Sequence, residues 1–188
     1  ITSDDFLALM RSTDAGDTWE RVPTNLPPDF PLGQAFYNFC IAVSPVNKNL
    51  VFVGGIEVYR STDAGSTFYR TTFANQVVHV DQHAFAFQPM TDALYAGNDG
   101  GVFRTSTKGD TWERRDATLV TTQFYSLAVD QRNPGRIFGG TQDNGTVRLS
   151  IPPDRWQIIR GDVDGGALCL DSNFLYTMGT LSIFPFRS

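Results

Sequence analysis

The sequence predicts an all-β fold built from repeated units of short antiparallel strands. The first observation behind this prediction is a turn motif that occurs three times along the chain. The second is a series of short apolar runs, punctuated by Gly, Pro and Asn, between successive copies of the motif. Aromatic residues make up 13% of the 188 residues, and helical periodicity is hard to find. The repeat therefore indicates the fold class before any single residue is interpreted.

The turn motif spans 12–19 and recurs at 61–68 and 105–112. A Ser or Thr oxygen, and an Asp oxygen two residues later, can accept hydrogen bonds from backbone N–H groups of a tight hairpin. A glycine then suits a positive φ, and a closing aromatic is expected to anchor the outgoing strand on the layer beneath. In the third copy Thr107 replaces the Asp, so that hairpin is expected to be held less firmly. The residues assigned to the motif are Ser12, Asp14, Gly16, Trp19, Ser61, Asp63, Gly65, Phe68, Thr105, Gly109 and Trp112.

This motif resembles the Asp box, or BNR repeat, which marks the hairpin between the third and fourth strands of β-propeller blades. The resemblance implies four-stranded antiparallel blades within one propeller segment covering 1–188. Propellers use about four to eight blades, and this chain holds about four, so a partial propeller is expected unless another chain or segment completes it. The blade pieces are placed at about 6–22, 36–72, 83–116, 123–160 and 166–188.

Small side chains recur on one face of each predicted first strand, which suits the innermost strand where blades converge. They are Cys40, Ala42, Ala84, Ala86, Ser126, Ala128, Ala167 and Cys169. Cys40 and Cys169 are therefore expected to be buried thiols, and whether they pair stays open.

Composition excludes several classes of function. The formal net charge is −5 with acids and bases interspersed, so no basic stripe for nucleic acid is present. No apolar run approaches the ~20 residues of a transmembrane helix, so membrane insertion is not expected. The chain begins at Ile1 without an initiator Met or signal peptide, as expected of a processed protein or an excised piece. No cofactor is predicted.

In a propeller, the hairpins between second and third strands and the links between blades share one end of the blades, opposite the repeated turns. The unusual polar residues of this chain fall in those segments. They are His79, Asp81, His83, Asn98, Asp99, Tyr125, Gln142, Asp143, Asn144, Asp162 and Asp164. We therefore expect any ligand site at that end.

Three of these segments read Asn-Asp-Gly-Gly at 98–101, Gln-Asp-Asn-Gly at 142–145 and Gly-Asp-Val-Asp-Gly-Gly at 161–166. Over 36–188 the chain is similar to secreted bacterial BNR-repeat proteins, which are related to sortilin-type propellers and to xyloglucan-cleaving family-74 glycoside hydrolases. The resemblance implies an extracellular or periplasmic module that binds a polysaccharide or protein ligand. The ligand-binding candidates are Asn98, Gln142, Asn144, Tyr125 and Asp164.

An alternative hypothesis is that the chain is part of an O-glycosyl hydrolase. Glycosidases need two carboxylates, ~5–5.5 Å apart for retention or ~6.5–9.5 Å for inversion. The candidate acids are Asp99, Asp143 and Asp162. Asn-Asp-Gly-Gly and Gln-Asp-Asn-Gly are also good turn formers, so a structural use of Asp99 and Asp143 stays open.

Two further interpretations stay open. His79, Asp81 and His83 alternate, so in an extended segment they would project to one side as metal ligands; ordinary hydrogen bonding in a blade link is the alternative. The chain could also be an architectural fragment of a larger assembly, in which other copies or further propeller segments complete the ring.

Overall fold

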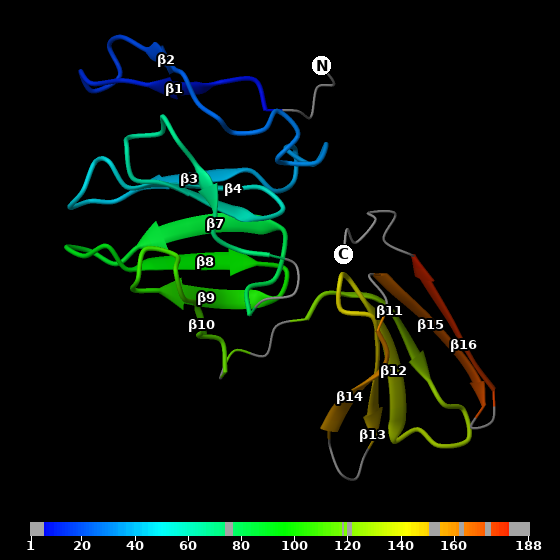
Figure 1. Ribbon diagram of the computed structural model, residues 1–188. Helices are drawn as coiled ribbons and strands as arrows, with labels where there is room; N and C mark the ends of the chain where they lie inside the picture. Colours follow the sequence, from blue (N-terminus) through cyan, green and yellow to red (C-terminus); the bar gives the residue numbers. More distant parts are fainter. Residues whose placement is uncertain are drawn as a thin grey trace. The chain divides into compact units, whose positions relative to one another are not determined.

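The computed structural model describes residues 6–73, 77–117, 119, 122–150, 155–161, 164–171 and 174–180, the last two by their backbone alone. The chain divides into two units, Ile1–Leu119 and Val120–Ser188, which we describe separately. All regular structure in the described residues is β-strand (Figure 1). No helix long and apolar enough to cross a membrane occurs among them.

The first unit contains a two-stranded sheet followed by two four-stranded sheets. The two-stranded sheet pairs β1 (Leu9–Arg11) with β2 (Glu20–Val22). The next sheet has the order β3 (Cys40–Val43), β4 (Val51–Gly54), β5 (Val58–Ser61) and β6 (Tyr69–Arg70). The third has the order β7 (Gln82–Phe87), β8 (Leu94–Asn98), β9 (Gly101–Thr105) and β10 (Glu113–Arg114).

The second unit contains one four-stranded sheet and one hairpin among its described residues. The sheet has the order β11 (Phe124–Val129), β12 (Arg136–Thr141), β13 (Thr146–Ser150) and β14 (Arg155–Arg160). The hairpin pairs β15 (Asp164–Asp171) with β16 (Phe174–Thr180).

Each four-stranded sheet is an antiparallel meander in which sequence neighbours are spatial neighbours, which is the construction of a propeller blade. The predicted fold class is therefore confirmed: the chain is all-β, with four-stranded antiparallel blades of a partial propeller. In the first unit the sheets are stacked in chain order, from β1–β2 through β3–β6 to β7–β10 (Figure 1).

The repeated turns form the hairpins β1–β2, β5–β6 and β9–β10. In the second copy Ser61 Oγ accepts a hydrogen bond from the Gly65 N–H at 2.8 Å, and Asp63 Oδ1 accepts one from the Thr67 N–H at 2.8 Å. The first copy has the same bonds, from Gly16 N–H to Ser12 Oγ at 2.8 Å and from Thr18 N–H to Asp14 Oδ1 at 2.9 Å.

The third copy keeps this geometry without a carboxylate. Thr107 Oγ1 accepts the hydrogen bond of the Thr111 N–H at 2.8 Å, and Thr105 Oγ1 accepts that of Gly109 at 2.8 Å. The acceptor is therefore a neutral hydroxyl rather than a charged group, and charge-assisted bonds are the stronger ones. The weaker hold expected of this turn stays a prediction.

The glycine of every copy has a positive φ, as predicted: 101° at Gly16, 92° at Gly65 and 91° at Gly109. The residue before it also has a positive φ, which the sequence did not indicate, because Ala and Lys rarely adopt that region. These residues are Ala15 (60°), Ala64 (58°) and Lys108 (58°). Two consecutive positive φ values give the twist that favours a tight hairpin.

Two apolar clusters hold the stacked sheets of the first unit together. One contains Leu26, Phe30, Val51, Val53 and Phe68, with Phe6, Leu9 and Tyr59 packed against it. The other contains Leu50, Phe52, Val58 and Leu94, with Ala42, Phe85, Phe87 and Trp112 packed against it. Each joins one sheet to the next in chain order.

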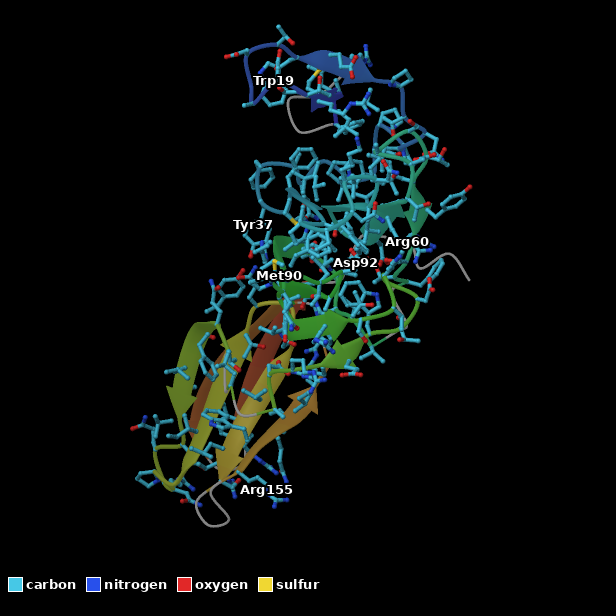
Figure 2. The ribbon with its side chains drawn as sticks, turned by 90° about the vertical axis from the view of Figure 1, so that its left-hand side faces the viewer. Trp19, Tyr37, Arg60, Met90, Asp92 and Arg155 are labelled. Atoms are coloured by element: carbon cyan, nitrogen blue, oxygen red, sulfur yellow. The ribbon has the colours of Figure 1, made fainter. Side chains whose placement is uncertain are left out.

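The closing aromatics of the turns anchor as predicted in two copies of three. Phe68 is buried in the first cluster, and Trp112 packs against the second. Trp19 is 62% exposed, so the prediction is wrong for this residue (Figure 2). Phe68 and Trp112 pack toward the preceding sheet, and no described sheet precedes β1–β2.

The small residues of β3 lie where two blades approach closely. A Cβ on Gly54 would lie 2.7 Å from Cys40 Sγ and 2.6 Å from Gln82 Cβ, so β4 has no room for a side chain there. Cys40 is a free thiol, and burial raises its pKa to about 12. The side chain of Cys169 lies outside the described part.

Candidate functional site

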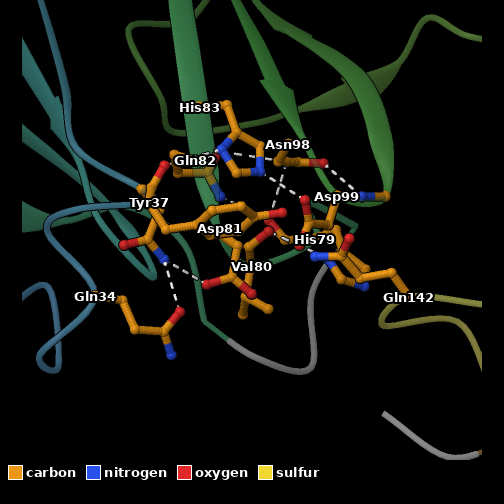
Figure 3. A network of polar contacts seen from close by, with 12 residues as sticks. Gln34, Tyr37, His79, Val80, Asp81, Gln82, His83, Asn98, Asp99 and Gln142 are labelled. Atoms are coloured by element: carbon orange, nitrogen blue, oxygen red, sulfur yellow. Dashed lines mark hydrogen bonds and ion pairs between the residues drawn. The ribbon is translucent and has the colours of Figure 1, made fainter. Parts of the chain in front are cut away.

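Three segments of the first unit meet at the end of the blades opposite the repeated turns. They are 34–38, which leads into β3, 79–83, which leads into β7, and the β8–β9 turn at 98–101. We call this surface the polar end. It brings together five of the predicted site residues, namely His79, Asp81, His83, Asn98 and Asp99, with the additional residues Gln34, Tyr37, Asn38 and Gln82 (Figure 3).

The link before β7 is fixed by backbone hydrogen bonds to the β4–β5 turn. The N–H of Asp81 donates to Ile56 O at 3.0 Å, and the N–H of Gln82 donates to Gly55 O at 2.8 Å. Asp81 has a φ of 64°, and β7 begins only at Gln82. Residues 79–81 are therefore not part of a strand, so the condition under which His79, Asp81 and His83 would project to one side is not met.

Two side-chain amides fix the position of this link by donating hydrogen bonds to its backbone. Gln82 Nε2 donates to His79 O at 2.7 Å, and Asn98 Nδ2 donates to the same carbonyl at 3.0 Å. Asn98 Oδ1 in turn accepts the N–H of Gly100 at 3.1 Å. The side chain of Asn98, predicted to bind ligand, thus connects the β8–β9 turn to the link and has a structural task.

Asp81 lies beneath the surface and contacts a residue that the sequence did not single out. Asn38 Nδ2 donates to Asp81 Oδ1 at 2.6 Å, and Asn38 is fully buried. Burial raises the pKa of Asp81, the negative charge of Asp99 raises it further, and the Asn38 hydrogen bond lowers it. The nearest carboxylate oxygens of Asp81 and Asp99 lie within 4.8 Å of each other.

A signal for Asn38 was present in the repeat. When the first strands are aligned on their small residues, Asn38 stands two positions before Cys40, just as Gln82 stands two positions before Ala84. Both amides are fully buried at the same end of neighbouring blades. Repeated polar residues in a link, and not only unusual ones, would have indicated this pair.

His83 connects Asp99 to an aromatic side chain. His83 Nε2 lies 2.6 Å from Asp99 Oδ1, and its ring packs edge-on against Tyr37 with 4.7 Å between ring centroids. Its Nδ1 lies 3.4 Å from Tyr37 O. The ring centroids of Phe36 and Tyr37 lie 6.4 Å apart. Phe36 is 78% exposed and Tyr37 is 42% exposed. The result is a continuous row of aromatic and polar groups at the surface.

The glycines of the β8–β9 turn are required by close packing. A Cβ on Gly100 would lie 2.3 Å from His79 Cβ, and a Cβ on Gly101 would lie 1.8 Å from Asp116 Oδ2, with φ at 127°. Asp116 is buried and paired with Arg114 at 2.5 Å. Protein atoms therefore fill the space that these glycines leave open, and the functional interest moves to the Asp99 side chain.

The remaining candidates belong to the second unit. Asp143 has a φ of 54°, and Asn144 Nδ2 donates to Gln142 O at 2.9 Å inside the β12–β13 turn. Thr141 Oγ1 donates to Gly145 O across that turn at 2.6 Å. Tyr125 on β11 is exposed. Asp162 lies outside the described residues, and Asp164 begins β15, where the backbone alone is described.

Comparison with solved structures finds proteins of low similarity to this chain. An ancestral GH74 enzyme is 21% identical over 81% of this chain and 21% of its own, with a TM-score of 0.40. The GH74 xyloglucanase from Xanthomonas campestris is 17% identical, and the match covers 90% of this chain and 25% of that protein, with a TM-score of 0.39. YCF48 from Cyanidioschyzon merolae is 20% identical, and the match covers 80% of this chain and 48% of that protein, with a TM-score of 0.39.

This chain thus spans about a fifth to a half of those proteins' lengths. No family model matches it, and no curated protein does. All three identities are below 25%, so the activities of these proteins are not transferred to this chain.

Proposed function

We propose that the chain is a carbohydrate-binding propeller module of a secreted protein, and that the polar end of its first unit binds a polysaccharide. The observation that carries this proposal is the row formed by Phe36, Tyr37 and the His83–Asp99 pair. Exposed aromatic faces next to fixed polar groups suit a ligand with apolar ring faces and hydroxyl rims, which is the chemistry of a sugar.

The charge of the chain narrows the ligand. The formal net charge is −5, so acidic side chains outnumber basic ones on the chain. A surface of this sign repels anionic ligands and favours neutral or basic ones. We therefore expect neutral polysaccharides such as β-glucans to bind better than uronic-acid polymers.

A binding assay on immobilised neutral glycans, including xyloglucan, tests the proposal. The Phe36→Ala variant is expected to lose affinity about tenfold, the effect of about 1.4 kcal/mol. Tyr69→Ala is the matched control, because Tyr69 is an exposed aromatic on β6 away from the polar end. Equal affinity of the parent and Phe36→Ala would contradict a stacking site.

Other outcomes would replace the proposal. Release of reducing sugar from xyloglucan, lost in Asp99→Asn, would favour the glycoside hydrolase alternative. Binding to a basic peptide and to no glycan would favour a protein ligand. Absence of binding to both would leave the architectural interpretation.

A further inference from the structure

Two buried carboxylates face each other at the polar end. The nearest oxygens of Asp81 and Asp99 lie within 4.8 Å, and the Asp99 side chain is only 11% exposed. Two like charges this close and this far from water repel each other strongly, and their repulsion is relieved when a positive charge enters between them.

The hydrogen bonds of the two carboxylates leave acceptor capacity unused. Asp81 Oδ1 accepts one bond from the neutral Asn38 amide, and Asp99 Oδ1 faces His83 Nε2. Asp99 Oδ2 is buried and has no hydrogen-bond partner in the described part of the chain. Buried polar atoms are nearly always partnered, so this carboxylate oxygen is available to a further ligand.

Asn38 supplies an independent observation. Its side chain is fully buried and directed at Asp81, yet its Oδ1 has no partner among the described residues. A half-turn about the Cβ–Cγ bond exchanges the amide oxygen and nitrogen. The oxygen would then face Asp81 Oδ1 in place of the nitrogen, which would give up its 3.4 Å hydrogen bond to Gln34 Oε1.

We propose that Asp81, Asp99 and Asn38 bind a calcium ion, with His83 orienting the carboxylate of Asp99. The donors are oxygens, which hard divalent cations prefer. Oxygens on opposite sides of Ca²⁺, each at about 2.3–2.6 Å, lie up to about 5 Å apart, whereas those on Mg²⁺ lie about 4 Å apart. A separation within 4.8 Å lets both oxygens reach one Ca²⁺, and Ca²⁺ accepts irregular sets of oxygens, whereas Mg²⁺ demands near-ideal octahedral geometry.

This set differs from the triplet that alternation indicated. Asp81 is common to both sets. His79 is absent, because its Nδ1 lies 3.1 Å from Val80 O, and His83 acts through Asp99 rather than on the metal.

Titration calorimetry of the full chain with calcium chloride, after removal of metal by chelation, tests the proposal. We expect one binding site, and at least a tenfold loss of affinity in Asp81→Asn and in Asp99→Asn. Asp110→Asn is the matched control, because Asp110 is an exposed acid paired with Arg60. No glycan is present, so this result is independent of the outcome for polysaccharide binding.

Thermal unfolding followed by circular dichroism distinguishes loss of the site from loss of the fold. In the absence of calcium, Asp99→Asn is expected to melt no lower than the parent, because the repulsion with Asp81 is gone. Added calcium should raise the Tm of the parent and of Asp110→Asn, and leave that of Asp99→Asn unchanged. A folded parent that shows neither heat nor a Tm shift with calcium would overturn the proposal, as would magnesium binding of equal affinity.

Discussion

The first and third copies of the repeated turn, at 12–19 and 105–112, share their backbone hydrogen bonds but differ in what lies beneath them. Gly16 and Gly109 donate to equivalent hydroxyls at the same 2.8 Å. Trp112 packs on the Leu50–Phe52–Val58–Leu94 cluster of the preceding sheet, whereas Trp19 is mostly exposed. The turn is therefore determined locally, and the burial of its aromatic depends on a neighbouring blade.

The first strands β3 and β7 differ in the same way. Phe85 and Phe87 on β7 pack on the cluster shared with β3–β6. Ile41 and Val43 occupy the corresponding positions on β3, on the same face as Val51 and Val53, and are 54% and 51% exposed. The sheet that packs against β7 has four strands, whereas the sheet that packs against the β3–β6 sheet from the other side has two. Part of the face that carries Ile41 and Val43 is therefore not covered by described residues.

The largest expected effect is on the aromatic anchors. Trp112→Ala should lower the free energy of unfolding by about 2–4 kcal/mol, since it removes a large ring from a packed cluster. Trp19→Ala should lower it by less than about 0.5 kcal/mol, as is usual for exposed positions. Urea denaturation followed by circular dichroism measures both. Equal losses would mean that Trp19 is covered in solution by something outside the described residues.

A smaller effect tests whether the conformation of the repeated turn is determined locally. Ala15→Gly and Ala64→Gly should each raise the free energy of unfolding by about 0.5–1 kcal/mol, because alanine is strained at φ near 60° and glycine is not. The gain should be similar in both turns, although their packing differs. Ala86→Gly in β7 is the control, and there the added backbone freedom should lower stability. A gain in only one turn would show that packing, not backbone strain, dominates.

The smallest effect concerns pH. The hydrogen bond from the Thr18 hydroxyl, followed by those of the Thr18 N–H and Ser12, lowers the pKa of Asp14 from 3.8 to about 2. The folded state thus favours the charged form, so the contribution of Asp14 is complete above about pH 4 and is lost as the pH falls toward 2. Asp14→Asn should flatten the dependence of Tm on pH across this window.

The third turn provides the control for this prediction. Thr107 carries no charge, so Thr107→Asn should leave the slope of Tm against pH unchanged. A slope in the Asp14→Asn variant equal to that of the parent would assign the acid dependence to other carboxylates.

The fold class and the positions of the turns were predictable from the sequence because their determinants are local. Ser61 and Gly65 are four residues apart, as are Asp63 and Thr67, so any chain with these residues can form the hairpin. Strand order followed from the same repeats, since short connections join neighbouring antiparallel strands. Whether each closing aromatic is buried was not predictable, because its burial depends on the presence of the preceding sheet.

The candidate site was predictable only in part. Unusual polar residues in the links indicated His83 and Asp99, which the structure places 2.6 Å apart. Asn38 was missed because only unusual polar residues were singled out, and its alignment with Gln82 in the repeat was not used. Its hydrogen bond to Asp81 spans 43 positions of the chain. No local pattern predicts such a pair, since it depends on how closely two blades approach.

The sequence by itself therefore determined where the chain turns and which strands pair, because side-chain oxygens and glycines act on the backbone within a few residues. The tertiary structure alone decided which carboxylates face each other and which side chains are buried between them. Along the chain Asp81 and Asp99 are separate candidates, one in a link and one in a turn. They become a pair of buried charges only when the link before β7 is fixed against the β4–β5 turn.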